Sequence, residues 1–244
     1  MRFLLPAALL TGVFFSLACG YLDEVETEDI VSTIPWADEE ESQYVIVSRD
    51  DEDTVLGRGT LSVSKTDGEY ELVVDFANED GTDVATVLVD ENTLKPSFVR
   101  RVFGFLDGKI TEGTYDPVEM IVDTEEIEGE DRRLVPARLE EHYYDNESSL
   151  FLWRTIRFEK GYQASYSSVL VNRGGESQVV TLLVDRQQEI TVPAGTFTTW
   201  RVMMRTDDVQ QVLLFAVTPD HVMIQYDNSR GQLIQLTETS VSGA

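Results

Sequence analysis

The feature that most constrains this fold is a two-residue alternation of apolar and polar side chains, which begins near Tyr44. In residues 69–76 every second side chain is large and apolar (Tyr70, Leu72, Val74 and Phe76). Residues 60–64 repeat the alternation, and Asp67-Gly68 lies between the two runs. Asp-Gly suits the positive φ angles of a tight hairpin turn. The pattern therefore predicts antiparallel strands with one face buried.

Further strands are expected along the rest of the chain, separated by turn residues, at 83–89, 97–106, 109–115, 118–123, 162–171, 178–184, 188–192, 196–205, 209–217, 221–226 and 232–241. Residues 124–133 are dense in carboxylates and are expected to form a solvated loop or strand end. One short helix is predicted after Asp145 or Asn146, either of which can cap it. Its apolar stripe would hold Leu150, Trp153 and Ile156.

This order of elements predicts a mainly β protein, an antiparallel open barrel or strongly curved sheet with one short helix and two similar strand-rich halves. Residues 212–217 are apolar on both faces. Such a strand is central in a sandwich, covered by a helix, or lines an apolar cavity. We expect a single β-rich domain over residues 44–244.

The N-terminus has the form of a secretory signal. Met1-Arg2 supplies one positive charge, and residues 3–17 are almost wholly apolar, too short a run to span a membrane. The boundary Leu17-Ala18-Cys19-Gly20 resembles the lipobox of bacterial lipoproteins. The resemblance implies a signal peptide over residues 1–18, with acyl chains on the sulfur and the new amino group of Cys19. The alternatives are an ordinary secreted protein with a chance cysteine, or a buried apolar helix.

Charge and cysteine content restrict the partners. The chain has 45 acidic against 19 basic residues, a net charge of −26, which argues against nucleic acid. Anionic headgroups would repel this surface, so the acyl chains would hold the protein on a membrane of the cell envelope, plasma or outer. Cys19 is the only cysteine, so no disulfide can form. Residues 19–43 are expected to be a lipidated acidic tether, interrupted by Ile34-Pro35-Trp36, which could pack onto the domain.

No catalytic, metal or cofactor site is indicated. The chain has no Gly-x-Ser-x-Gly elbow, and only His142 and His221 could act as histidine bases. The acidic runs 50–53 and 123–131 lack the spacing of the helix–loop–helix calcium motif. Carboxylate pairs suited to hydrolysis remain an alternative, because 45 acidic residues produce chance pairs.

Three segments carry a family resemblance: residues 89–96, residues 192–202, and a strand–Pro-Asp–strand unit at residues 215–226. In this order they resemble a bacterial envelope family, domain of unknown function 3108, over residues 44–239. The resemblance implies a β-rich fold similar to the open-barrel lipoprotein carriers that hold acyl chains on a concave sheet. It brings no catalytic residues.

The leading hypothesis is a non-enzymatic, membrane-anchored envelope lipoprotein whose β domain binds a hydrophobic ligand or an envelope protein. Candidate residues for lining a ligand cavity are the large side chains Trp153, Phe158, Trp200, Phe215 and Tyr226, each of which could instead be ordinary core. The alternatives are a structural or assembly lipoprotein with a filled core, and a carboxylate-dependent hydrolase.

Overall fold

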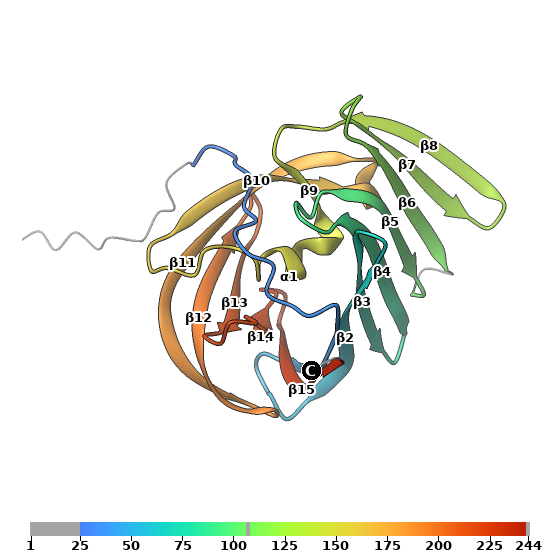
Figure 1. The fold of residues 1–244 in the computed structure, drawn as a ribbon. Helices are drawn as coiled ribbons and strands as arrows, with labels where there is room; N and C mark the ends of the chain where they lie inside the picture. Colours follow the sequence, from blue (N-terminus) through green and yellow to red (C-terminus); the bar gives the residue numbers. More distant parts are fainter. Residues whose placement is uncertain (1–24, 106–107, 243–244) are drawn as a thin grey trace, which may run out of the picture.

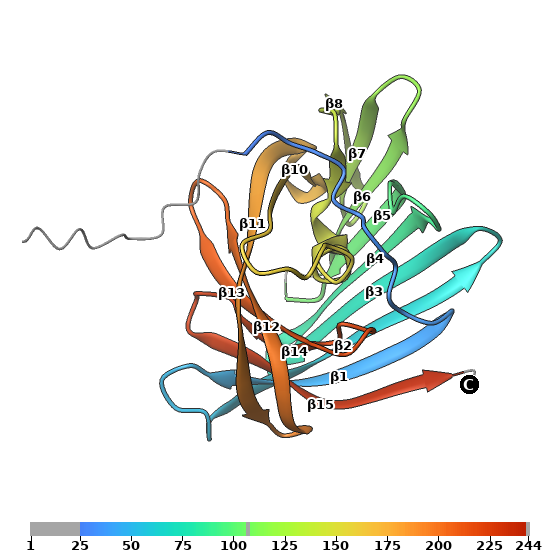
Figure 2. The same cartoon turned by 60° about the vertical axis from the view of Figure 1, so that its left-hand side comes forward.

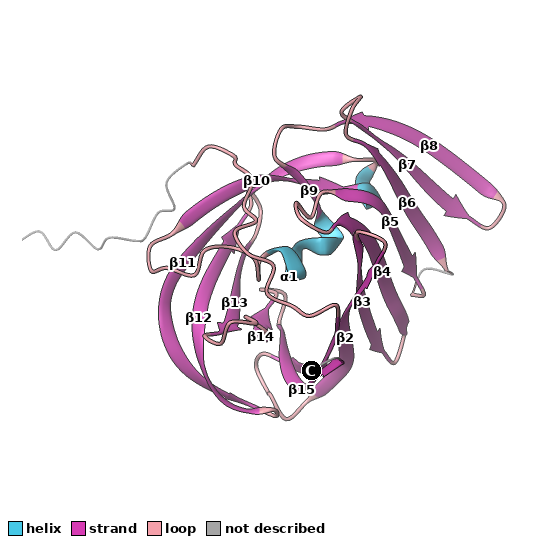
Figure 3. Ribbon diagram, in the orientation of Figure 1, coloured by secondary structure: helices cyan, strands magenta, loops and turns pink. Residues whose placement is uncertain are grey.

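The computed structural model describes residues 25–105 and 108–242, which form one 15-stranded sheet curved into an open trough (Figures 1 and 3). Neighbouring strands are antiparallel except β9 and β10, which are parallel. The strand order is β8-β7-β6-β5-β4-β3-β2-β1-β15-β14-β13-β12-β11-β10-β9. β8 and β9 are therefore the two free edges, and the expected open, strongly curved antiparallel sheet is confirmed.

The first half is a meander of hairpins. Its strands are β1 (Glu39–Ser48), β2 (Val55–Thr66), β3 (Glu69–Asn78), β4 (Gly81–Asp90), β5 (Pro96–Phe103), β6 (Lys109–Asp116), β7 (Ile121–Glu128) and β8 (Asp131–Arg138). The predicted Asp67-Gly68 turn joins β2 to β3, and both residues have positive φ, 50° and 89°. The alternation in β3 places Tyr70, Leu72 and Val74 in the core.

The second half contains β9 (Tyr143–Asp145), η1 (Asn146–Ser148), α1 (Ser149–Leu152), β10 (Gln163–Leu170), η2 (Val171–Arg173), β11 (Glu176–Val192), β12 (Gly195–Arg205), β13 (Gln210–Ala216), β14 (Met223–Asp227) and β15 (Gln232–Ser242). β15 pairs with β1 and joins the halves. The two strands expected at 178–184 and 188–192 are one strand, β11, with a bulge between Val184 and Arg186.

Of the two alternatives expected for residues 124–133, a loop is wrong and a strand end is nearer to the structure, because β7 continues to Glu128 and β8 starts at Asp131. The charged side chains of this segment are solvated because the segment lies at the edge of the sheet. β8 is an edge strand whose side chains are largely solvated, and charges suit such an edge. Arg132 also pairs with Glu125 across the hairpin at 3.0 Å.

The predicted helix is present but shorter than its apolar stripe. η1 and α1 together cover residues 146–152, so Trp153 and Ile156 lie beyond the α-helical turn. Asp145 is the N-cap, and its carboxylate accepts the backbone N–H of Glu147 at 2.7 Å. The helix lies within the trough, and all four α1 residues are buried (Figure 1). Within the described ranges, no helix is long and apolar enough to cross a lipid bilayer.

Residues 25–38, here called the strap, differ from the expected free tether. Ile30 and Trp36 are only 1% and 7% exposed, and Thr27 forms a parallel bridge with Ser165. Figures 1 and 2 show the strap crossing the trough beside α1 before β1 begins at Glu39. The packed region thus includes residues before 44, where the β-rich domain was expected to start. The segment Ile34-Pro35-Trp36 packs onto the domain through Trp36, as the sequence allowed, whereas the acidic composition gave no indication that Ile30 is buried.

A buried ion pair between Glu40 and Arg154 connects β1 to the turn after α1. The sequence gave no indication of it, because Glu40 lies within a run of acidic residues. Glu40 accepts two hydrogen bonds from Arg154, at 2.7 and 3.1 Å, and both side chains are 4% exposed. Arg154 also donates to the carbonyl of Asp220 at 2.8 Å. Buried charges are tolerated when they are paired and hydrogen-bonded in this way.

Candidate functional site: a cavity on the concave side of the sheet

The concave side of the sheet is incompletely filled. A cavity of about 670 Å³ lies between the helical segment and the sheet, with a lining drawn from both halves of the chain. This volume falls within the roughly 300–1,000 Å³ typical of small-molecule sites. Exposed residues such as Asn78, Arg173, Asp208 and Arg230 belong to the lining, so the cavity opens to solvent at this rim.

The inner lining is apolar, and we call it the apolar floor. It consists of eight buried side chains from strands and the helical segment: Ile46, Val74, Leu150, Trp153, Leu170, Val180, Met204 and Ile234. The strand members point inward because alternate residues of a strand face the same side. Trp153 is held in place by a hydrogen bond from its Nε1 to the hydroxyl of Tyr166 at 2.9 Å. The floor therefore offers a preformed apolar surface.

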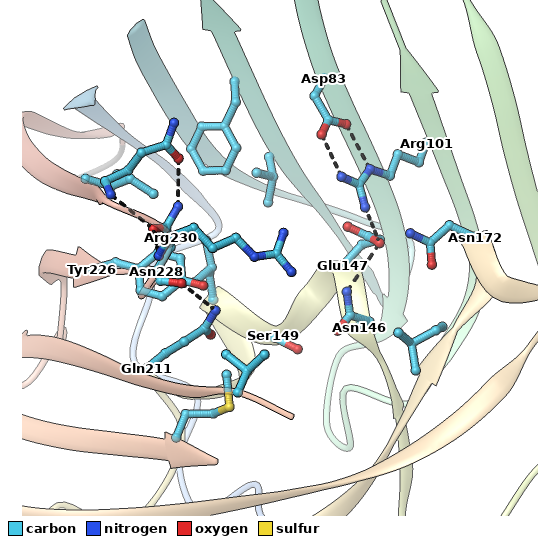
Figure 4. Close-up of a pocket in the computed structure, with 18 of the residues that line it drawn as sticks. Asp83, Arg101, Asn146, Glu147, Ser149, Asn172, Gln211, Tyr226, Asn228 and Arg230 are labelled. Atoms are coloured by element: carbon cyan, nitrogen blue, oxygen red, sulfur yellow. Dashed lines mark hydrogen bonds and ion pairs between the residues drawn. The ribbon is translucent and has the colours of Figure 1, made fainter. Parts of the chain in front are cut away.

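One polar wall is organised by Arg101 of β5. Its guanidinium donates two hydrogen bonds to Asp83, at 2.8 and 2.6 Å, and one to Glu147 at 2.8 Å (Figure 4). Burial opposes the charge of Arg101, but the two carboxylates outweigh it and raise its pKa. Asn146 and Asn172 lie on the same side of the cavity. This wall fixes the strand β5 to the helical segment.

The opposite wall comes from β13, β14 and the turn before β15. Asn228 donates to Oε1 of Gln232 at 2.7 Å and accepts the backbone N–H of Arg230 at 2.9 Å. Gln211 donates to the carbonyl of Asn228 at 3.3 Å. Tyr226 also lies here, and burial raises the pKa of its phenol, which therefore stays neutral. Figure 4 shows Arg230 extending between the two walls.

The charge of the lining is balanced. Three carboxylates (Asp83, Glu147 and Asp208) and three guanidinium groups (Arg101, Arg173 and Arg230) line the cavity. The remaining polar lining is dominated by seven carboxamides: Asn78, Asn146, Asn172, Gln178, Gln211, Asn228 and Gln232. The cavity is thus amphipathic and locally neutral within a chain whose net charge is −26.

A buried carboxyl group supports the helical segment that contributes Leu150 and Trp153 to the cavity. Asp145 has no exposed surface, and it accepts hydrogen bonds from the hydroxyl of Tyr115 and the backbone N–H of Glu147. Burial, reinforced by the nearby charge of Glu147, raises the pKa of Asp145 to about 7. The position of the helical segment therefore depends on a group that titrates near neutrality.

Of the five residues predicted to line a cavity, Trp153 and Tyr226 do so. Phe158 and Phe215 pack against each other with ring centroids 5.6 Å apart, and Phe215 is wholly buried in the core. Trp200 is half-buried and packs against the same core without lining the cavity. Trp200 and Phe215 face the same side of the sheet as Met204 and Gln211, which line the cavity, but they lie four residues further along their strands, where the space is filled by packed side chains. Cys19 lies outside the described residues.

The two histidines are also away from the cavity. His221 bonds through Nδ1 to the carbonyl of Ala216 at 3.0 Å and lies against the ring of Phe158. His142 lies 3.4 Å from Asp29 of the strap. Across the described parts of the chain, no group of three or more His, Cys, Asp or Glu side chains is arranged to hold a metal ion.

Sequence reasoning missed the polar residues of the site. No recognisable motif surrounds the strand and turn residues Arg101, Asn172, Gln211 and Asn228. For the strand residues, the only signal in the sequence was the alternation that places every second side chain on the inner face. The turn residues have no such signal. Their convergence depends on the curvature of the sheet.

The fold and the site together define an open, strongly curved β-sheet protein with an amphipathic cavity on its concave side. The family model for a protein of unknown function, DUF3108, matches residues 43–232, and the chain belongs to this family. A crystal structure of a Bacteroides fragilis protein inferred to be exported, with a YmcC-like fold, aligns at 8% identity and a TM-score of 0.31. That alignment covers 87% of this chain and 99% of the other. No curated protein matches the sequence.

Proposed function

We propose that this protein is a non-enzymatic lipoprotein of the cell envelope whose cavity binds a hydrophobic, acyl-bearing ligand. The observation that carries the proposal is the apolar floor of a cavity of about 670 Å³. Leaving apolar surface in contact with water costs about 25 cal/mol per Å². A filled core would avoid this cost, so an unfilled apolar hollow is best explained by a ligand that occupies it.

The proposed location rests on the N-terminus. The charged start, the apolar run of residues 3–17 and Cys19 follow one another in the order of a lipoprotein signal. Acylation of Cys19 would attach the protein to the plasma or outer membrane, facing away from the cytoplasm. An acyl-bearing ligand is abundant at such a surface, which makes the anchor and the cavity mutually consistent.

A chain-length series tests ligand binding. The mature chain carrying Cys19→Ser (residues 19–244) is titrated calorimetrically with alkyl ligands of eight, ten and twelve carbons that share one headgroup. Each buried methylene contributes about 0.8 kcal/mol, so affinity should rise about fourfold per carbon. Absence of saturable binding across the series would contradict the proposal and favour the structural alternative.

Two neighbouring residues of β3 supply a matched pair of variants. Val74 belongs to the apolar floor, whereas Val73 points to the convex face. Val74→Trp should fill the cavity and weaken binding at least about tenfold, while Val73→Trp should change it less than about twofold. Circular dichroism at the titration temperature checks that both variants are folded. Equal effects on binding would place the ligand outside the cavity.

The hydrolase alternative has a specific point against it. Asp83 and Glu147 are two of the three carboxylates in the cavity, and both are held by Arg101. Each of these carboxylates is therefore part of an ion-pair network that joins β5 to the helical segment, and the two are not arranged as a free pair on either side of a bound substrate. The non-enzymatic proposal is tested by incubating the protein with ester and glycoside substrates, which should be recovered unchanged.

A further inference from the structure

The polar half of the cavity has a chemical preference of its own. Seven carboxamides line it, and each carboxamide carries both a hydrogen-bond acceptor and two donors. A hydroxyl group likewise donates and accepts, so it can satisfy either end of an amide. An anionic head only accepts, and a quaternary ammonium head does neither.

One of these amides lacks a partner. The side-chain oxygen of Asn172 is buried and makes no hydrogen bond to any described residue. An unpaired buried acceptor is costly, and native structures usually supply it with a donor. Asn172 lies on the Arg101 wall, opposite Gln211 and Asn228 (Figure 4). This oxygen is turned away from solvent, and rotation of the Asn172 amide about χ2 brings it to the cavity. In that rotamer a ligand between the walls donates to Asn172 while it bonds to the opposite amides.

The charges of the site argue against a charged head. Arg101 already holds Asp83 and Glu147, and the lining as a whole contains three positive and three negative groups. The cavity thus offers no net charge to an anion or a cation. The chain as a whole carries −26, and this field repels an approaching anion.

We propose that the ligand of the cavity carries an uncharged, hydroxyl-rich head, as a glycolipid does, which the amides bind while the apolar floor receives its alkyl chain. This inference rests on the proposed function and narrows it to one ligand class. The head lies between the two polar walls, and the alkyl chain extends toward Trp153.

Three twelve-carbon probes test the head. The mature Cys19→Ser chain is titrated with monomeric dodecyl maltoside, dodecanoate and dodecyltrimethylammonium, each below its micelle concentration. Dodecyl maltoside should bind at least about tenfold more tightly than either charged probe, since only it hydrogen-bonds to several amides. Equal affinities would overturn the inference on the head and leave the proposed function standing. If no probe binds, the proposed function itself fails.

Amide variants locate the interaction. Asn172→Leu and Gln211→Met keep the approximate size of each side chain and remove its hydrogen bonds. Each should weaken maltoside binding about two- to tenfold and leave dodecanoate binding within about twofold. Gln187→Met, at an exposed position on β11 outside the cavity, is the control and should change neither. Equal weakening of both probes would assign the amides a structural role and overturn the inference.

Discussion

Asp145 shows how one side chain links burial, helix capping and the cavity. It caps the helical segment, accepts a hydrogen bond from the hydroxyl of Tyr115, and has no exposed surface. Its pKa in the folded protein is about 7, against 3.8 as the ordinary value. Between these values the folded state holds a proton that the unfolded state has released. The stability that this proton contributes is complete below about pH 4 and is lost as the pH rises through 7.

Asp145→Asn should therefore change the pH dependence of stability. Asparagine keeps an oxygen for the N–H of Glu147 and cannot ionise. Relative to the variant, the wild type should lose free energy of unfolding as the pH rises from 5 to 8, by an amount on the order of 3 kcal/mol, with most of the loss below pH 7. Urea denaturation of both proteins at several pH values measures the difference.

Asp90→Asn provides a control with the opposite sign. Burial acts to raise the pKa of Asp90, but the hydrogen bonds from the side chain and backbone of Thr93 and the backbone of Asn92 together outweigh it and lower the pKa. The contribution of Asp90 to stability is therefore present above pH 4 and lost as the pH falls. Parallel stability profiles for wild type and Asp145→Asn across pH 5 to 8 would show that Asp145 does not titrate in this range.

At the scale of elements, the strap differs most from its expected structure, because it packs onto the domain and is not a free tether. Its backbone bonds to the rest of the domain at two places: the N–H of Glu28 donates to Ser165 at 2.8 Å, and that of Ser32 to Thr155 at 2.9 Å. Ile30 lies between these bonds and is buried. From Cys19 to Val25 an extended chain spans at most about 20 Å. A protein acylated at Cys19 would therefore stay close to its membrane.

Adjacent residues of the strap allow a direct test of its packing. Ile30→Ala should lower the free energy of unfolding by about 2–5 kcal/mol, because it leaves a cavity in a packed core. Val31→Ala, at the half-buried neighbouring position, should cost less than about 1 kcal/mol. Chemical denaturation measures both values. Similar small losses would mean that the strap contributes little to the core.

At the scale of the whole molecule, we expect the proposed anchor and the domain to be separable. Cys19→Ser removes the proposed acylation site, which lies outside the described residues. The variant should leave the membrane fraction while its circular dichroism and unfolding midpoint match those of the wild-type domain. Fractionation of cells that express each form measures this. A variant that still sediments with membranes would show that Cys19 is not the anchor.

The class of fold and most of the strands followed from the sequence alone, although β8 and β9 did not. Alternation in residues 69–76 and the Asp67-Gly68 turn are local properties, because a strand has a period of two whatever it pairs with. Local composition was less informative at residues 124–133, where the charge density suggested a solvated loop or strand end and the two strands of an edge hairpin are present. Edge strands tolerate charged side chains, but the position of a strand at an edge depends on how the other strands pair and cannot be deduced from its own residues.

Only the tertiary structure decided the site. Alternation shows which side chains face inward, but not which inward residues meet across a curved sheet. Arg101 and Glu147 are 46 positions apart, and Asn172 and Gln211 occupy different walls of one cavity. Trp153 and Tyr226 reach that cavity, while Phe158, Trp200 and Phe215 fill the core beside it. Curvature is a collective result of fifteen strands, so the hollow and its amphipathic lining exist only after the sheet has formed.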